Sequence, residues 1–303
     1  NSFTERYPRF KDFAAAPEEE ILRLWQGLGY YSRARNMVSA AREVEERYGG
    51  QFPRTYDALR RLKGVGPYTA AAIASIAFDE PAAAVDGNVA RVLSRLFGVR
   101  EPVNKPAGEK AIQSLAAELL DRENPGLHNQ AMMEFGALQC IPGTPDCEGC
   151  PLKEHCHAYA HGEVNSLPVK IRKAKPRPRY FTFLVAEHDR SLYLEKRAAD
   201  DIWHALWQFP LAESKKLLPE ASLFPFCLDT HHLSPGDLVV RHISPVIKHQ
   251  LTHQTLHARF VHAQVTGQGF TPPPTWKKVA VEALDDHALP RLIDKYLDNT
   301  LRG

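Results

Sequence analysis

Four of the five cysteines lie close together in the sequence, where their thiolates can serve one metal centre. Their spacing is Cys140-x6-Cys147-x2-Cys150-x5-Cys156, and Cys227 stands apart. Five cysteines in 303 residues are too few for a disulfide framework, so the group indicates a metal site. By their chemistry, four thiolates suit either a tetrahedral zinc ion, which is the commoner choice, or an iron–sulfur cluster.

A second candidate site is the glycine-rich turn Leu62-Lys63-Gly64-Val65-Gly66-Pro67, which joins two segments with helical patterns. Glycine lets the backbone approach a ligand closely, and the second helix begins with N–H groups that have no partner inside the helix. Such a helix start binds anions, and a DNA phosphate is one candidate. A plain corner between two helices is the alternative that the turn by itself favours.

Asp86 and Asn88 form a third candidate site, in the segment Val85-Asp86-Gly87-Asn88 that begins another helical pattern. Taken alone, either side chain is most simply an N-cap, which contributes about 1 kcal/mol to helix stability.

The order of these three features resembles the helix-hairpin-helix DNA glycosylases of the endonuclease III superfamily. The resemblance rests on the Leu-x-Gly-hydrophobic-Gly turn, the Val-Asp pair after it and the cysteine spacing. It implies that Asp86 is the essential catalytic carboxylate, that Asn88 holds it in position, and that the four clustered cysteines bind a [4Fe-4S] cluster with a structural or DNA-docking role. A carboxylate suits this role, because breaking an N-glycosidic bond builds positive charge on the sugar. The loop 141–146 departs from the family pattern, because it has no basic residue for a phosphate.

Position 68 separates members of this superfamily from one another. Members that also cut the DNA strand carry a lysine there, which forms a Schiff base with the opened sugar. This chain has Tyr68, and no lysine lies between Lys63 and Lys105. We therefore predict a monofunctional glycosylase, in which Tyr68 hydrogen-bonds Asp86 or the sugar, or else packs at the start of its helix.

The segment Leu24-Trp25-Gln26-Gly27-Leu28-Gly29-Tyr30-Tyr31-Ser32-Arg33-Ala34-Arg35-Asn36 resembles the adenine-specific branch, the MutY family, which removes adenine opposite 8-oxoguanine. The resemblance implies that Tyr30 wedges into the base stack beside the oxidised guanine, and Leu28 is expected to contact DNA with it. An aromatic side chain on a glycine turn suits intercalation. A tyrosine buried in the core is the alternative.

Residues 180–303 contain short runs rich in β-branched and aromatic residues, which predict strands. The stretches 192–197 and 203–210 resemble the Nudix-like module of adenine glycosylases. The Arg-Glu…Glu-Glu metal ligands of the Nudix box are absent after Pro210, so we predict no pyrophosphohydrolase activity. The resemblance implies that this module recognises 8-oxoguanine through a loop that reads Phe-Ser-His in the family. Here it reads Leu251-Thr252-His253, and Leu251 replaces the aromatic residue.

Length and composition predict a soluble, multi-domain globular protein. The chain is 44% hydrophobic and 24% charged, and its net charge of +2 does not by itself indicate a nucleic-acid partner. Residues 1–160 carry −2 and residues 161–303 carry +4, and six cations and two prolines between 170 and 179 predict an extended linker. We expect an all-α helix-hairpin-helix glycosylase domain with an iron–sulfur loop over 1–163, a basic linker over 164–179 and an α+β Nudix-like domain over 180–303.

Hydrophobic periodicity and turn residues place the secondary structure. Apolar stripes at helical spacing predict helices that begin at Pro17 and cover 37–44, Thr55–Leu62, Pro67–Phe78, Asn88–Phe97, Pro106–Leu120, Asn129–Cys140 and Ala283–Leu301. Alternation and β-branched residues predict strands at Tyr180–Glu187, Ser191–Lys196, Val239–His242, Val246–Leu251 and Leu256–Val265.

The expected function is excision of adenine from A:8-oxoguanine pairs in double-stranded DNA. We expect a monomer without a membrane partner, located in the cytoplasm at a bacterial nucleoid. The family's general acid is a glutamate on an N-terminal helix, but none of the 24 residues before Trp25 matches that helix. The chain is therefore expected to be N-terminally truncated and impaired as it stands. The alternatives are an endonuclease III-type pyrimidine or mismatch glycosylase, against which Tyr68 and the C-terminal domain argue, and a non-catalytic lesion-binding protein.

Overall fold

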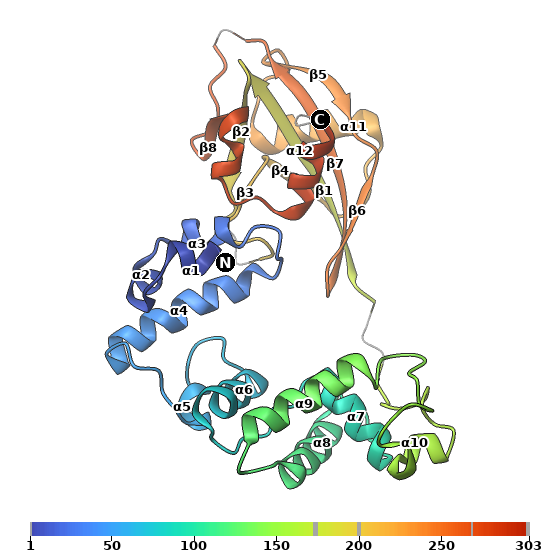
Figure 1. Ribbon diagram of the computed structural model, residues 1–303. Coiled ribbons are helices and arrows are strands. Elements are labelled where there is room, and N and C mark those ends of the chain that lie inside the picture. Colours follow the sequence, from blue (N-terminus) through green and yellow to red (C-terminus); the bar gives the residue numbers. More distant parts are fainter. Residues whose placement is uncertain (1, 172–174, 199–200, 268, 301–303) are drawn as a thin grey trace. The chain divides into compact units, whose positions relative to one another are not determined.

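The computed structural model describes residues 2–171, 175–198, 201–267 and 269–300 (Figure 1). The chain forms two compact units, one of residues 39–173 and the other of residues 1–38 together with 174–303. We call them the helical unit and the sheet unit. The division falls inside α4 (Tyr31–Tyr48), so the boundaries expected from the sequence, 1–163, 164–179 and 180–303, cut the chain elsewhere. Residues 172–174 of the expected linker lie outside the described residues.

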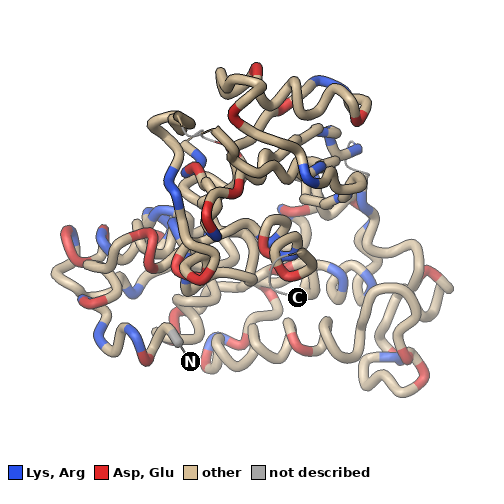
Figure 2. The backbone as a smooth tube through the Cα atoms, turned by 90° about the horizontal axis from the view of Figure 1, so that it is seen from above, with Lys and Arg blue, Asp and Glu red and all other residues tan. Residues whose placement is uncertain are grey.

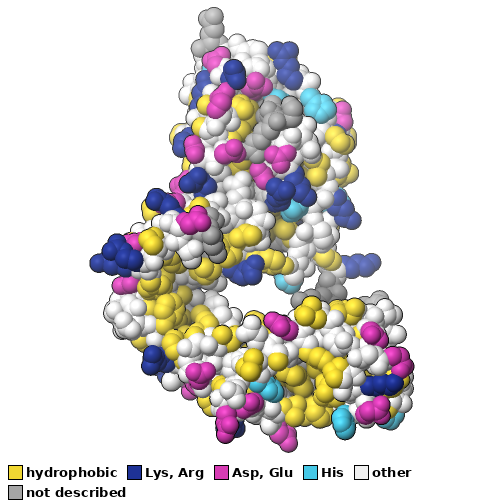
Figure 3. Space-filling model, in the orientation of Figure 1, with side chains coloured by type: hydrophobic (Ala, Val, Ile, Leu, Met, Phe, Trp, Pro, Cys, Tyr) yellow, Lys and Arg dark blue, Asp and Glu magenta, His cyan; other side chains and the backbone are white. Residues whose placement is uncertain are grey.

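Short helices build the helical unit, and proline stands in the first turn of three of them, α6, α8 and α9, where its missing N–H costs nothing. Val89 and Leu93 form the apolar face of α7, which packs against Ile112 and Ala116 of α8. Figure 3 shows hydrophobic side chains gathered on one face of this unit. After α4, its helices are α5 (Tyr56–Leu59), α6 (Pro67–Phe78), α7 (Gly87–Phe97), α8 (Pro106–Leu119), α9 (Pro125–Leu138), a 3₁₀ turn η1 (Lys153–His155) and α10 (His157–Ala160).

The sheet unit begins with three short N-terminal helices, α1 (Ser2–Arg6), α2 (Phe10–Ala15) and α3 (Glu18–Leu24). Ile21 and Leu22 of α3 are fully buried in one cluster with Leu206 and Ala288, which lie far along the chain. The Tyr31 hydroxyl donates to the Leu289 carbonyl at 3.1 Å. Residues 1–38 therefore fold onto the C-terminal half.

An eight-stranded mixed sheet forms the centre of this unit, in the order β3-β2-β1-β7-β5, with β4 paired to β1, β6 to β7 and β8 to β2. Strands β1 and β7 are parallel, and their register sets Phe183 opposite Phe260, whose rings stack 5.1 Å apart. The other pairs are antiparallel. The strands are β1 (Arg177–His188), β2 (Ser191–Lys196), β3 (Trp207–Gln208), β4 (Leu211–Ser214), β5 (Leu238–Ile243), β6 (Ile247–Gln250), β7 (Gln254–Val265) and β8 (Trp276–Ala280).

Two helices cover the two faces of the sheet. In β1, Phe181, Phe183 and Val185 share a cluster with α12 (Arg291–Thr300), whereas Leu184 and Ala186 share one with α11 (Glu220–His231). Successive side chains of a strand point to opposite faces, so residues 181–186 of β1 are all buried, and all but Thr182 are apolar, because both faces are covered there.

The predicted fold class is confirmed, since helices dominate the first half and a mixed sheet with helices forms the second. The prediction of one helix over Ala283–Leu301 is wrong. A 3₁₀ turn η2 (Val281–Asp286) comes first, α12 begins only after Pro290, and Leu301 lies outside the described residues. Helix α9 begins at Pro125, four residues before the predicted start. None of the described helices combines the length and the apolar character needed to cross a membrane.

Candidate functional site

The predicted turn in the helical unit connects α5 to α6. Gly64 has φ of +79°, in the left-handed region that favours glycine, and the Arg60 guanidinium donates to the Val65 carbonyl at 3.3 Å. Gly66 is the N-cap of α6, and none of the described side chains caps this end of the helix. Lys63 is exposed beside it. The amides of the first turn of α6 and the Lys63 ammonium therefore form a surface suited to an anion.

Asp86 is the N-cap of α7, and its carboxylate is held at three points. One oxygen, Oδ1, accepts from the backbone amides of Asn88 and Val89, each at 2.8 Å. The other, Oδ2, accepts from the Asn88 side-chain amide at 3.0 Å. Asp86 as a whole is half-buried. The N-terminus of α7 also favours the negative charge, because the helix dipole is positive there.

Helix α9 holds the segment that leads to Asp86. The Asn129 side chain accepts from the Ala84 amide at 3.0 Å and donates to the Ala82 carbonyl at 2.8 Å. Gly136 of α9 lies directly against Asn88, since a Cβ atom there would stand 2.7 Å from the Asn88 Cβ. Both contacts restrict the position of the carboxylate.

Arg91 connects the Asp86 site to the cysteine segment, a link that the sequence did not reveal. Its guanidinium donates to Asn88 Oδ1 at 2.9 Å, to the Gly136 carbonyl at 2.5 Å and to the Cys140 carbonyl at 2.7 Å. Only 7% of Arg91 is exposed, and burial lowers the pKa of its guanidinium, with the nearby Arg95 acting the same way. An arginine among apolar positions of α7 was the available signal, because buried arginines almost always have partners.

Arg95, one turn further along α7, contacts the cysteine segment itself. Its Nη1 donates to Cys140 Sγ at 3.4 Å and to the Ile141 carbonyl at 2.9 Å, and the Cys156 thiol donates to the Arg95 carbonyl at 3.6 Å. The Arg95 guanidinium therefore lies beside the Cys140 sulfur, and the Arg95 backbone carbonyl beside the Cys156 sulfur.

The four clustered cysteines carry free, half-buried thiols. Among the described residues, no group of three or more His, Cys, Asp or Glu side chains is placed to hold a metal ion. Burial first, and then the charges of Cys140, Cys156 and Cys150, raise the pKa of the Cys147 thiol. Four cysteine thiolates are the ligands of iron–sulfur clusters, so the donor set fits such a group.

Tyr68 lies in the first turn of α6 and is 41% exposed. Its hydroxyl donates to Met133 Sδ at 3.2 Å, instead of to Asp86 as one prediction had it.

Tyr30 and Leu28 belong to the sheet unit, on a turn that glycines make possible. Gly27 and Gly29 have φ of +86° and +69°, and Tyr30 itself has φ of +48°. Tyr30 is 68% exposed and Leu28 61%, so the alternative of a buried core tyrosine is wrong. The Trp25 indole donates to the Gly29 carbonyl at 2.8 Å and secures the turn.

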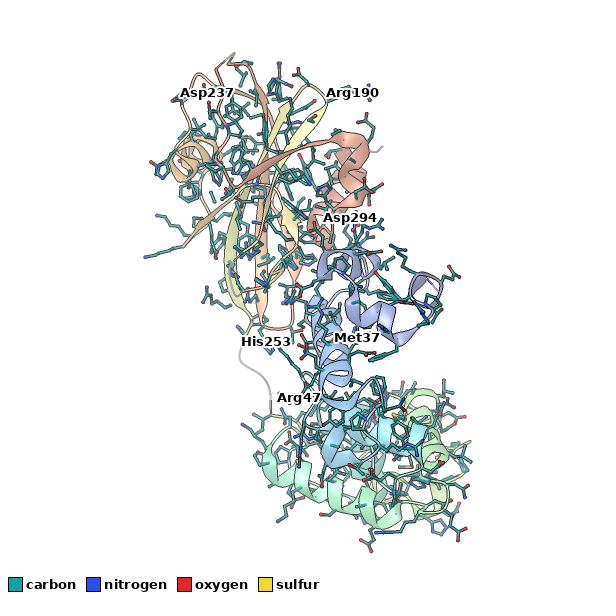
Figure 4. The ribbon with its side chains drawn as sticks, turned by 90° about the vertical axis from the view of Figure 1, so that its left-hand side faces the viewer. Met37, Arg47, Arg190, Asp237, His253 and Asp294 are labelled. Carbon is teal, nitrogen blue, oxygen red and sulfur yellow. The ribbon has the colours of Figure 1, made fainter. Side chains whose placement is uncertain are left out.

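The predicted lesion loop lies beside this turn. Thr252 Oγ1 is 3.4 Å from the Tyr30 hydroxyl, across 222 positions of sequence. Thr252 and His253 are exposed at the end of the β6–β7 hairpin, where Figure 4 labels His253, whereas Leu251 is half-buried against the sheet core. The structure thus brings together two segments that were predicted separately to contact the same oxidised base.

Gly29→Ala is expected to lower the free energy of unfolding of the sheet unit by about 1 kcal/mol, because an L-residue is strained at positive φ. A Cβ atom at Gly29 would meet nothing within 4 Å, so the expected loss of stability comes from backbone strain and not from a steric clash. All four tryptophans of the chain, at 25, 203, 207 and 276, belong to this unit, so urea denaturation followed by tryptophan fluorescence isolates its unfolding.

Gly236→Ala is the matched control. It has equal space for a Cβ atom and no positive φ, so its effect should stay within about 0.5 kcal/mol. Equal effects of the two substitutions would contradict the strain argument.

Residues 1–122 match the family described as HhH-GPD superfamily base excision DNA repair protein, and residues 181–299 match the NUDIX domain family. The adenine DNA glycosylase of Mus musculus is 45% identical over 168 residues, which are 54% of this chain and 33% of that protein. That of Buchnera aphidicola subsp. Baizongia pistaciae is 34% identical over 210 residues, which are 69% of this chain and 59% of that protein. A solved structure of a thermostable thymine-DNA glycosylase is 35% identical with a TM-score of 0.49, covering 53% of this chain and 74% of that chain.

The match spans between a third and three fifths of the length of these two curated relatives. The two domain families follow one another in the order that the motifs predicted, and the curated relatives share one name. The chain belongs to the adenine DNA glycosylase (MutY) family, within the HhH-GPD superfamily of base excision DNA repair proteins.

Proposed function

We propose that the protein removes adenine paired with 8-oxoguanine in double-stranded DNA, by hydrolysing the N-glycosidic bond. The observation that carries this proposal is the Asp86–Asn88 arrangement at the start of α7, in the same unit as a hairpin suited to DNA phosphate, in a chain related to adenine DNA glycosylases. The partner oxidised base is proposed from the pairing of Tyr30 with Thr252, two residues that the family resemblance assigned to it.

Asp86 has the chemistry that the bond cleavage requires. As the bond from the sugar to adenine breaks, its electron pair leaves with the base and positive charge develops on the sugar. A fixed carboxylate stabilises that charge without reorganising, because its donors already hold it in place. A water molecule then forms the new bond to the sugar and loses one proton, while the departing adenine takes up one proton. The products are an abasic site and neutral adenine.

Tyr68 supports a monofunctional reaction. A phenol cannot form an imine with the opened sugar, whereas a lysine amine can. Strand cleavage by that route is therefore not expected, and the abasic strand should remain intact until alkali is added.

We also propose that the four clustered cysteines hold a [4Fe-4S] cluster. When bound, the cluster supplies a rigid anchor for the cysteine segment. Arg95 and Arg91 connect that segment to α7, and so to the helix end that carries Asp86. The residues of this chain thereby position Asp86, while the cluster takes no part in the bond cleavage.

The test uses the complete gene product with duplexes that contain A:8-oxoguanine, thymine glycol or G:T. Strand breaks at the adenine position of the first duplex, and only after alkali, are the expected result. Breaks without alkali, or breaks at thymine glycol or at the G:T pair, would contradict the proposal.

A further inference from the structure

A cavity of about 320 Å³ lies in the sheet unit, where the turn between β5 and β6, β6 itself and the C-terminal half of α12 meet. Apolar side chains, among them Pro245, Ile247 and Leu292, form part of its wall. The described residues that line it include no aspartate and no glutamate. Its basic side chains are His242, Lys248, His249 and Lys295.

The two lysines of this cavity carry uncompensated charge. Among the described residues, neither Lys248 nor Lys295 has a recorded ion pair or hydrogen bond, and both are exposed. Burial first, and then the charge on Lys295, lower the pKa of His249, so the positive charge at neutral pH rests on the lysines. A concave wall that carries charge of one sign focuses the electrostatic potential inside it. The positive potential of this cavity therefore attracts an anion.

The size and the wall of the cavity indicate which anion. An ammonium group binds phosphate as a compact point charge. The apolar part of the wall suits the sugar that a phosphate ester carries, and a volume of about 320 Å³ is within the range of small-ligand sites. A phosphate ester combines both properties.

The position of the cavity favours a DNA phosphate over a free one. His249 precedes Leu251 of the lesion loop by two residues, which in a strand span about 7 Å. Phosphates follow each other every 3.4 Å along the axis of one DNA strand. A strand whose base lies against Thr252 and His253 therefore carries a phosphate within reach of the cavity.

We propose that this cavity is a phosphate-binding site, which takes a backbone phosphate of the DNA strand held by the loop Leu251-Thr252-His253. The assignment to DNA rests on the proposed function. A free mononucleotide offers the same chemistry, and the test below separates these two sources.

The first arm measures how salt weakens binding to a duplex that has a tetrahydrofuran abasic analogue opposite 8-oxoguanine and so is not turned over. The variant is Lys248→Gln with Lys295→Gln, both at exposed positions. Each lost phosphate contact reduces the magnitude of the slope of log K against log salt by about 0.9, so a reduction of about 0.9 is expected for the one phosphate of this site.

Lys278→Gln is the matched control. Lys278 is exposed and lies 3.6 Å from Asp189, which precedes Arg190 in the chain. Figure 4 places Arg190 at the end of the sheet unit opposite His253. The control should therefore leave the slope unchanged, and an equal decrease in both variants would overturn the assignment to this cavity.

The second arm titrates dGMP and inorganic phosphate into the wild-type chain and the double variant, following the His249 ring by NMR. The salt slope could stay unchanged while the wild type binds dGMP saturably and the double variant does not. That result would support a phosphate site whose ligand is a free nucleotide instead of DNA. An unchanged slope without such binding would overturn the proposal.

Both arms use the complete gene product and its variants. Adenine release from A:8-oxoguanine, measured on the same samples, distinguishes failure of the phosphate site from failure of the proposed function. If adenine release is normal, but the double variant changes neither the salt slope nor dGMP binding, the phosphate site is overturned and the proposed function stands. If the double variant reduces the salt slope but the wild-type protein releases no adenine, the phosphate site is supported and the proposed function is overturned.

Discussion

Replacing Asp86 with asparagine is expected to slow adenine release at least about 10²- to 10³-fold, the range found when one electrostatic stabiliser of a transition state is removed. Asparagine keeps an oxygen that accepts from the amides of residues 88 and 89, and it is as good an N-cap as aspartate. The negative charge is lost, and with it the hydrogen bond that Oδ2 accepts from the Asn88 side-chain amide, because the asparagine NH2 group in its place is a donor. The measurement is the single-turnover rate on an A:8-oxoguanine duplex, with alkali added to reveal abasic sites.

Asp86→Ser provides the control for the capping role, because serine also caps a helix and carries no charge. Both variants should retain the thermal stability of the helical unit and the affinity for the duplex, while both lose the rate. If Asp86→Asn released adenine at nearly the wild-type rate, the carboxylate would be a cap and no more.

Arg91→Ala is expected to lower the free energy of unfolding of the helical unit by about 2–3 kcal/mol. The substitution leaves the carbonyls of Gly136 and Cys140 and the Asn88 amide oxygen without their charged donor, and a buried unpaired acceptor costs about 1–3 kcal/mol. The rate of adenine release should fall as well, because Asn88, the partner of Asp86, becomes mobile. The measurement is urea denaturation followed by the helical circular dichroism signal.

The control for this second variant is Arg47→Ala in the same unit. The Arg47 side chain is 70% exposed and pairs with Glu43 one turn away, a type of pair that contributes only about 0.3–0.5 kcal/mol. The tryptophan fluorescence transition, which reports the sheet unit, should stay unchanged in both variants. A loss of stability for Arg91→Ala no larger than for Arg47→Ala would contradict the linking role.

The parts of the structure that the sequence predicted well depend on neighbours in the chain. The turn at Gly64 and Gly66, the α6 span Pro67–Phe78 and the strand Ser191–Lys196 follow from glycine, proline, aromatic and apolar residues within a few positions. Helix α11 was missed because Pro225 interrupts its pattern, and β8 because prolines precede it. In α11 and β8, tertiary packing outweighed the local sequence preference against a helix or a strand.

The parts that could not be predicted depend on contacts between distant segments. The spacing of Ile21 and Leu22 does not show that they are buried against Leu206 and Ala288. The hydrophobic effect is non-directional, so any apolar surface could cover these two side chains. The approach of Tyr30 to Thr252 follows from that docking. Lysine and arginine counts likewise conceal the basic cavity, because both signs of charge are interspersed along the backbone (Figure 2).

The docking of residues 1–38 onto the C-terminal half has a consequence during synthesis. Ile21 and Leu22 leave the ribosome long before Leu206 and Ala288 exist. At the usual 5–20 residues per second, the ribosome needs roughly 9 to 37 seconds to translate the chain from Leu22 to Leu206. For that time the apolar stripe of α3 stays uncovered in the nascent chain, where it is a binding site for chaperones and a risk for aggregation. The sheet unit completes its folding only late in translation, although its first helices are made first.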